Sequence, residues 1–446
     1  MNVIYCGFRC SALIFVLLNC EYGIACGGVT YTKDIAPILF KRCSNCHHPG
    51  YIAPMSLMTY TETRPWVRAI REAVVTRRMP PWYADGSHGT FRNDPRLSDS
   101  EIKLIVDWVD SGAQQGDNAD LPAPPVVSES WRIGKPDLII PIPEAHIVDP
   151  RAKDDYRIVM STVEIKQDIW IKAIELRPGN RKLVHHAHVF FIPPVAAQPP
   201  STSLFAKYAY HEDGAGPLRM RADAPVVDDA CRYFGQGGLP DMKPHGNSET
   251  LTTFVPGRAP EIYPSGYARL IPAGSRIGFQ IHYASGTGTV EKDRTSVGLI
   301  FADGPPQRVV RRLDLETFLF QIPSGAANHE VTFCYDFTED VRLLSLTPHM
   351  HLRGKDMMWE LMRPDAIKET LLVVPQYDFN WQIEYQFEKP VTAPAGSRLI
   401  VTAHFDNSAN NRVNPDPSKP VRWGEPKADE MAGSWVAYEL VRERLQ

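Results

Sequence analysis

Two cysteines and a histidine near the start of the chain constrain its fold more than any other residues. Cys43, Cys46 and His47 have the spacing Cys-x-x-Cys-His. This is the attachment pattern of a c-type haem, in which both thiols add to vinyl groups and the histidine binds the iron. A zinc knuckle is the alternative interpretation, but it needs further ligands at knuckle spacing, and the sequence has no second Cys-x-x-Cys. The motif therefore predicts one covalent haem c, redox chemistry and maturation outside the cytoplasm.

Residues 1–25 have the pattern of a signal peptide. Arg9 supplies a positive charge, residues 12–18 form a short apolar run, and small residues precede a cleavage point after Ala25. Cleavage there would leave Cys26 as the first mature residue, although no Leu lies three positions before it. We therefore expect a periplasmic or secreted protein, either unanchored or held to a lipid through Cys26.

Composition agrees with an exported globular protein of about three domains, given the 446 residues. The formal net charge of -4 shows no basic excess, which argues against nucleic acid as a partner. The 39 prolines and 30 glycines indicate many turns and favour β architecture. Cys231 and Cys334 remain unassigned, and an oxidising compartment would allow a disulfide between them.

The haem region is expected over residues 29–115. An amphipathic pattern predicts a helix over residues 65–77, and Ser98 with Glu101 forms a capping-box signal for another helix. Residues 116–130 are rich in proline and acidic residues without apolar periodicity, so they predict a linker. Helices that flank a methionine-bearing loop resemble a small class I-like cytochrome c.

The second axial ligand of the haem iron is expected to be Met79, because it lies in a proline-rich loop that follows the predicted helix. The alternative is that Met79 only packs against the ring and that Met55 or Met58 binds the iron instead.

From about residue 131 onward, short alternating runs separated by Pro and Gly turns predict β-sandwiches. Within residues 277–283, apolar side chains share one strand face, while Gln280 and His282 share the other. Further histidines occur in similar segments, and a methionine follows an acidic pair near the C-terminal end. Imidazole together with thioether suits copper. The candidate ligands are His185, His186, His188, His282, His349, His351 and Met431.

The order of these ligands, and the residues around them, resemble the copper type II ascorbate-dependent monooxygenases. That family includes peptidylglycine α-hydroxylating monooxygenase and dopamine β-monooxygenase. The resemblance implies two tandem antiparallel β-sandwiches, over residues 131–310 and 311–446, with one copper on each. One copper, which passes electrons, is implied on His185, His186 and His282. The other, which binds O2 and is catalytic, is implied on His349, His351 and Met431.

Strand geometry leaves one choice of ligands open. Neighbouring residues of a regular strand point to opposite faces, so His185 and His186 can bind one ion only at a bulge or at a strand end. His186 and His188 would share a face naturally. The resemblance favours the first pair, and His188 is then a supporting or packing residue.

The expected function is that of an exported haem-copper monooxygenase, which inserts one oxygen atom of O2 into a substrate C–H bond. Electrons would enter through the haem from an external quinol, cytochrome or small reductant, and the substrate would be a small organic molecule. Thr347 stands where the amidating relatives have an Arg that binds the peptide carboxylate, and Trp435 stands near their Tyr, so peptide C-termini are poor candidates. The alternative is a non-catalytic haem and copper protein that transfers electrons or binds copper.

Overall fold

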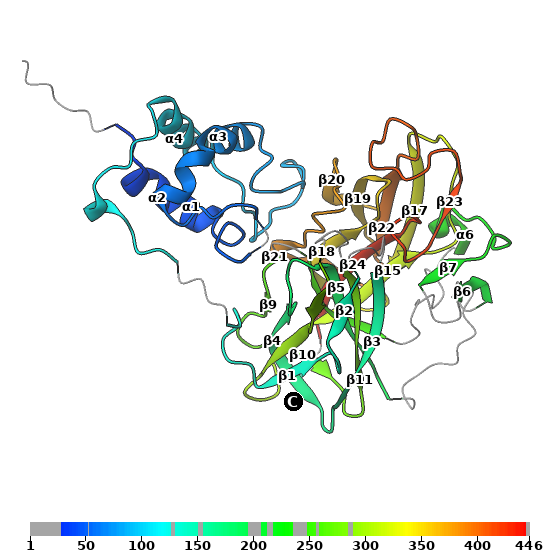
Figure 1. Cartoon of the computed structure of the whole chain (residues 1–446). Coiled ribbons are helices and arrows are strands. Elements are labelled where there is room, and N and C mark those ends of the chain that lie inside the picture. The colour runs from blue at the N-terminus through cyan, green and yellow to red at the C-terminus, as the bar shows by residue number, and fades with distance from the viewer. Residues whose placement is uncertain are drawn as a thin grey trace, which may run out of the picture.

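The chain folds mainly into β-strands that form several sheets, with a group of helices toward its N-terminal end (Figure 1). This confirms the predicted mainly-β class. The computed structural model describes residues 28–51, 53–125, 130–149, 155–194, 207–211, 217–234, 248–255, 258–283 and 289–442. The expected signal peptide and Cys26 lie outside these residues. No helix in the described part of the chain is long and apolar enough to cross a membrane.

The helices of the N-terminal region pack around one small apolar core. They are α1 (Ala36–Arg42), α2 (Tyr60–Thr63), α3 (Val67–Val75) and α4 (Asp99–Asp110), with a π-helical turn at Tyr31–Ile35 and 3-10 turns at Arg64–Trp66 and Asn118–Asp120. The helix predicted over residues 65–77 is shorter than expected, and Trp66, which belongs to the preceding 3-10 turn, is exposed. The capping box is present, because Ser98 Oγ accepts from the Glu101 amide and Glu101 Oε2 accepts from the Ser98 amide.

Two sheets face each other across an apolar core between residues 138 and 309, and we call them the first sandwich. One sheet has the order β1-β13-β4-β10-β14, with β9 beside β4, and the other has the order β3-β11-β5-β8. The first consists of β1 (Leu138–Pro141), β4 (Ile169–Arg177), β9 (Glu261–Ile262), β10 (Tyr267–Ile271), β13 (Ser296–Phe301) and β14 (Arg308–Val309). The second consists of β3 (Asp155–Glu164), β5 (Val184–Ile192), β8 (Glu249–Phe254) and β11 (Arg276–Tyr283). A small separate sheet pairs β2 (His146–Val148) with β12 (Glu291–Asp293).

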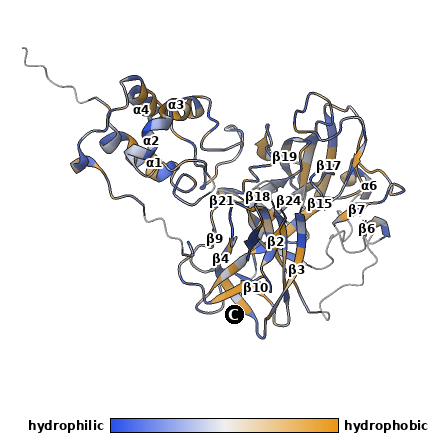
Figure 2. Cartoon of the chain, in the orientation of Figure 1, coloured by the Kyte–Doolittle hydropathy of each residue, from blue (hydrophilic) through white to orange (hydrophobic). Residues whose placement is uncertain are grey.

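Residues 311–440 form the second sandwich, whose sheets have the orders β15-β24-β18-β21 and β17-β22-β19-β20. Its strands are β15 (Arg311–Thr317), β17 (His329–Asp336), β18 (Val341–His349), β19 (Gly354–Met362), β20 (Lys368–Val374), β21 (Tyr385–Ala393), β22 (Arg398–Phe405) and β24 (Ala432–Leu440), with β16 (Gln321–Ile322) and β23 (Val421–Arg422) as a separate pair. Hydrophobic residues recur along the strands of both sandwiches and along α3 and α4 (Figure 2).

The segment between β5 and β8 leaves the first sandwich and packs on the second. It carries β6 (Ala209–His211), β7 (Leu218–Met220) and α6 (Ala230–Phe234). The Val227 amide donates to the Leu319 carbonyl at 2.6 Å, and Cys231 forms a disulfide with Cys334 of β17. The two cysteines that the sequence left unassigned therefore fasten this segment to the second sandwich.

The chain after α3 also attaches to the second sandwich. The Trp82 ring lies 4.8 Å from the Tyr385 ring, between centroids, and Phe91 packs against Phe387 at 5.5 Å. The Asp85 amide donates to the Val373 carbonyl. The segment beyond Met79 thus forms part of the core of the second sandwich.

We predict that Cys231→Ser lowers the free energy of unfolding by about 2–5 kcal/mol, because the disulfide closes a loop of about a hundred residues in the unfolded chain. Guanidinium denaturation at pH 7 measures the change. Reduction of the wild type should reproduce the loss and should leave the variant unaffected. An unchanged unfolding midpoint in the variant would contradict the prediction.

Candidate metal centre

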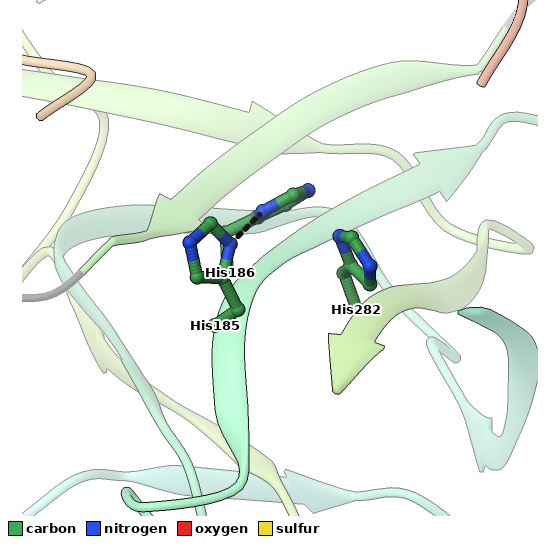
Figure 3. A group of neighbouring side chains, drawn as sticks. All are labelled: His185, His186 and His282. Atoms are coloured by element: carbon green, nitrogen blue, oxygen red, sulfur yellow. Dashed lines mark hydrogen bonds between the residues drawn. The ribbon is translucent and has the colours of Figure 1, made fainter. Parts of the chain in front are cut away.

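Three histidines of the first sandwich converge on one point (Figure 3). His185 and His186 come from β5, and His282 comes from the neighbouring strand β11. One ring nitrogen of each lies within 4.8 Å of the others, and the Nδ1 atoms of His185 and His186 are 3.0 Å apart. This spacing suits three ligands of one metal ion.

A β-bulge makes this convergence possible. His282 pairs with His186 in register, but the next residue, Tyr283, pairs with Val184. His185 is therefore the extra residue of a bulge, which turns its side chain toward the face that His186 occupies. In a regular strand His185 and His186 would point to opposite faces, but the bulge lets both side chains lie on the same face.

Burial keeps the His186 imidazole in the form that binds metals. His186 is buried, and burial together with the neighbouring His282 holds its pKa well below the usual value. A neutral imidazole has a lone pair for a metal ion, whereas a protonated one has none.

A second group of donors lies where β18 and β24 meet the connecting loops of the second sandwich. His349 ends β18, His351 follows it, and Met431 directly precedes β24. The Nε2 atom of His349 lies 3.2 Å from the Met431 sulfur, and the rings of His349 and His351 are 5.4 Å apart between centroids. Two imidazoles and one thioether thus meet at one place, a donor set that suits copper.

Other side chains fix the orientation of this second group. Gln382 Oε1 lies 2.8 Å from His349 Nδ1, so Nε2 is the atom that faces Met431. His351 Nδ1 lies 3.3 Å from the Asp429 carbonyl. Partners of this kind set the tautomer and ring angle of metal-binding histidines.

Glu430 ties the two ligand-bearing loops together. Its carboxylate is fully buried and accepts the amides of His351, Arg353 and Met431. Burial raises the pKa of Glu430 to about 8. Sequence reasoning noted Glu430 only as part of a motif and missed Gln382, because no local pattern announces a partner that lies 33 residues along the chain from His349.

The two groups open into one cavity between the sandwiches. The cavity, of about 80 Å³, is lined by His186 from the first group and by His349, His351 and Met431 from the second. Phe379 lies between the groups, because its ring is 5.4 Å from that of His185, 6.0 Å from that of His186 and 5.6 Å from that of His351. One aromatic side chain thus lies beside histidines of both sets of donors.

Two of the remaining candidate residues, His188 and Trp435, line the cavity. His188 lies outside the three-histidine group, and its ring is 5.2 Å from that of Trp435. Trp435 lines the cavity and lies 4.9 Å from the His349 ring. Thr347 is buried opposite Trp435 in the β18–β24 pair.

The Cys-x-x-Cys-His segment forms a helical turn that leaves both thiols unpaired with each other. Cys43 and Cys46 both carry free thiols, and the amides of Cys46 and His47 donate to the Cys43 carbonyl, which forms a helical turn. His47 Nδ1 lies 3.2 Å from the Met55 carbonyl, which leaves Nε2 as the nitrogen for an iron. Burial lowers the pKa of His47 and raises that of Cys43 to about 12, so both groups are neutral.

The methionine candidates occupy different environments. Met55, like Cys43, packs against the helical core, whereas Met79 is half-buried and its amide donates to the Ala73 carbonyl at the end of α3. Iron binding by Met79 stays a prediction.

No family model matches the chain, and no curated protein matches it. Among solved structures, a protein from Eubacterium rectale is 9% identical over 66% of this chain and 73% of its own, with a TM-score of 0.18. A Paenibacillus xanthan lyase is 9% identical over 73% of this chain and 29% of its own, with a TM-score of 0.16. At these TM-scores the likenesses carry no conclusion about fold or function.

The buried His349 predicts a pH dependence of stability. Burial lowers its folded-state pKa to about 4, below the value of about 6.5 in an unfolded chain. As pH falls through this window, the unfolded chain takes up the proton first, so the contribution of His349 to stability is lost below about pH 6.5. The metal-free wild type should therefore lose about 3 kcal/mol relative to His349→Asn between pH 7 and pH 4, at about 1.4 kcal/mol per pKa unit.

Urea denaturation of both metal-free proteins at several pH values measures this difference. Comparison with the variant cancels the opposing effect of Glu430, whose raised pKa favours the folded state as pH falls. A difference in unfolding free energy that stays constant with pH would contradict the prediction.

Proposed function

We propose that the protein is an exported copper monooxygenase with a fused c-type cytochrome region. The observation that carries this proposal is the common cavity, into which a three-histidine group and a His-His-Met group both open. One group would hold an electron-storing copper on His185, His186 and His282. The other would hold the catalytic copper on His349, His351 and Met431.

The bound cofactors supply one-electron chemistry: copper would activate O2 and store electrons, and a haem on Cys43, Cys46 and His47 would deliver electrons from outside. In this proposal the helical region over residues 29–115 is cytochrome c-like, and the two sandwiches are its copper domains. The reaction inserts one oxygen atom into a C–H bond and reduces the other to water, which consumes two electrons and two protons.

The protein's own side chains would prepare both groups for this chemistry. Gln382 presents His349 with Nε2 directed toward Met431, and Glu430 fixes the two loops relative to each other. Both arrangements exist before any substrate enters, so little reorganisation is needed. The Phe379 ring lies between imidazoles of the two groups, and in this proposal each group would hold its own copper.

The cavity lining bears on the substrate. The cavity lining includes the carboxyl side chains of Asp314, Glu316 and Glu425, and no Lys or Arg is among its described residues. Burial raises the pKa of Glu316 to about 8. With Thr347 in place of an Arg as well, an anionic substrate such as a peptide carboxylate is disfavoured. The substrate would be a small organic molecule without a negative charge at its reacting end.

Met431 provides the direct test. Reduced holoprotein mixed with 18O2 and a panel of small organic compounds should yield a product that carries one 18O atom. Met431→Ala should lower the rate of product formation by at least about tenfold, equivalent to about 1.4 kcal/mol in the barrier, with haem content unchanged. Met362→Ala, which alters a half-buried methionine at the end of β19, is the matched control and should behave as the wild type.

Wild-type protein that releases only peroxide, without 18O in any product, would support the non-catalytic alternative, an electron-transfer or copper-binding protein. Unchanged product formation in Met431→Ala would rule out the catalytic role given to that sulfur.

A further inference from the structure

His188 is a buried histidine that neither metal group uses, yet it lies beside both. It is on β5, two residues from His186 and on the same strand face. Its ring lies 5.6 Å from the His186 ring and 6.3 Å from the His349 ring, between centroids. A single imidazole is therefore adjacent to one candidate ligand of each copper.

The opposite side of His188 leads to another cavity. Its Nδ1 atom lies 3.1 Å from Thr253 Oγ1, across the β5–β8 pair in which the two residues are in register. Thr253 also lines a second, small cavity of about 20 Å³, whereas His188 lines the cavity of the metal groups. The pair of Thr253 and His188 thus forms the wall between the two cavities.

The second cavity adjoins the haem-attachment segment. Tyr51, a few residues beyond His47, lines it, and the Arg181 guanidinium lies 4.5 Å from the centre of the Tyr51 ring. Arg132 reaches the side chain of Asn45, between the two haem-binding cysteines, at 3.5 Å. The segment that would carry the haem therefore docks on the first sandwich at this cavity.

We propose that His188 is the residue through which electrons pass from the haem side to both copper groups, with Thr253 holding it in place. The proposal rests on the proposed function. In each transfer, ferrous haem loses one electron and becomes ferric, and one cupric ion gains it and becomes cuprous, so no bond is made or broken. Two such transfers load both coppers.

The physical reason for this route is that its side chains contact one another in series. Electron transfer slows steeply as the gap between groups widens, and a hydrogen bond and packed rings shorten the gap that must be crossed. Thr253, His188, and the rings of His186 and His349 form such a contiguous series. His188 would relay the electron without touching a reacting atom, and Thr253 is the positioning residue that holds its ring.

Three variants test the proposal. His188→Leu removes the ring and keeps an apolar side chain of similar size. Thr253→Val keeps the shape and removes the hydrogen bond. His404→Leu is the matched control, because His404 lies on β22 of the second sandwich and lines neither cavity.

The measurement is anaerobic stopped-flow spectroscopy of the oxidised holoprotein, mixed with less than one equivalent of an electron donor that reduces the haem. Haem absorbance reports reoxidation, and the Cu(II) EPR signal reports where the electron goes. We expect His188→Leu to slow haem reoxidation at least about tenfold, equivalent to about 1.4 kcal/mol in the barrier. Thr253→Val should slow it less, and His404→Leu should match the wild type, with haem potential and copper content unchanged in all three.

Reoxidation at the wild-type rate in His188→Leu would overturn the proposal while leaving the monooxygenase function in place. Loss of copper from that variant would also overturn it, because His188 would then be a ligand. A wild-type protein that takes up haem but no copper would overturn the proposed function and this proposal together.

Discussion

The interface between the two sandwiches is the constraint on which the rest of the structure depends. Arg258 pairs with Glu384 at 3.2 Å, and Arg312 lies 3.5 Å from Glu261, so buried charges of the first sandwich meet buried charges of the second. Burial alone would raise the pKa of Glu384, but Arg258 and Arg312 outweigh it and lower that pKa to about 2. Such pairs add little net stability, but they tolerate few alternative geometries, and here they fix how the two sandwiches face each other.

Each candidate copper group depends on that arrangement in a different way. The three-histidine group lies within one sheet and needs only the bulge at His185. The His-His-Met group needs two loops of the second sandwich, which Glu430 holds together. The common cavity needs both sandwiches at once, and Gln280 of the first donates across it to Glu425 of the second at 3.2 Å. In the proposed reaction, each sandwich would hold one copper that stores one electron, and the substrate would enter the cavity between them.

Several features of the fold could be predicted from the sequence, because strand alternation and helix capping depend on residues that lie close together in the chain. The mainly-β class and the capping box of Ser98 and Glu101 are confirmed. The alternation around His282 predicted its strand, and the structure brings His282 next to His185 and His186. Whether metals occupy these groups stays a prediction.

Other features depend on contacts between distant segments, which no local pattern encodes. The bulge at His185 depends on the register of β5 against β11, which a one-residue slip would change. Gln382 meets His349 only through the fold, and the segment with Cys231 leaves its own sandwich to join the other. The helix expected over residues 65–77 was too long, because the chain begins it as a 3-10 turn at Arg64–Trp66.

The central claim is that two distinct coppers serve one haem-linked site, and metal content tests it most directly. Mature protein produced with haem attachment and copper should contain one haem and two coppers per chain. His349→Ala and His282→Ala should each retain one copper and the haem. A protein with haem but no tightly bound copper, or one in which either substitution removes both coppers, would contradict the claim.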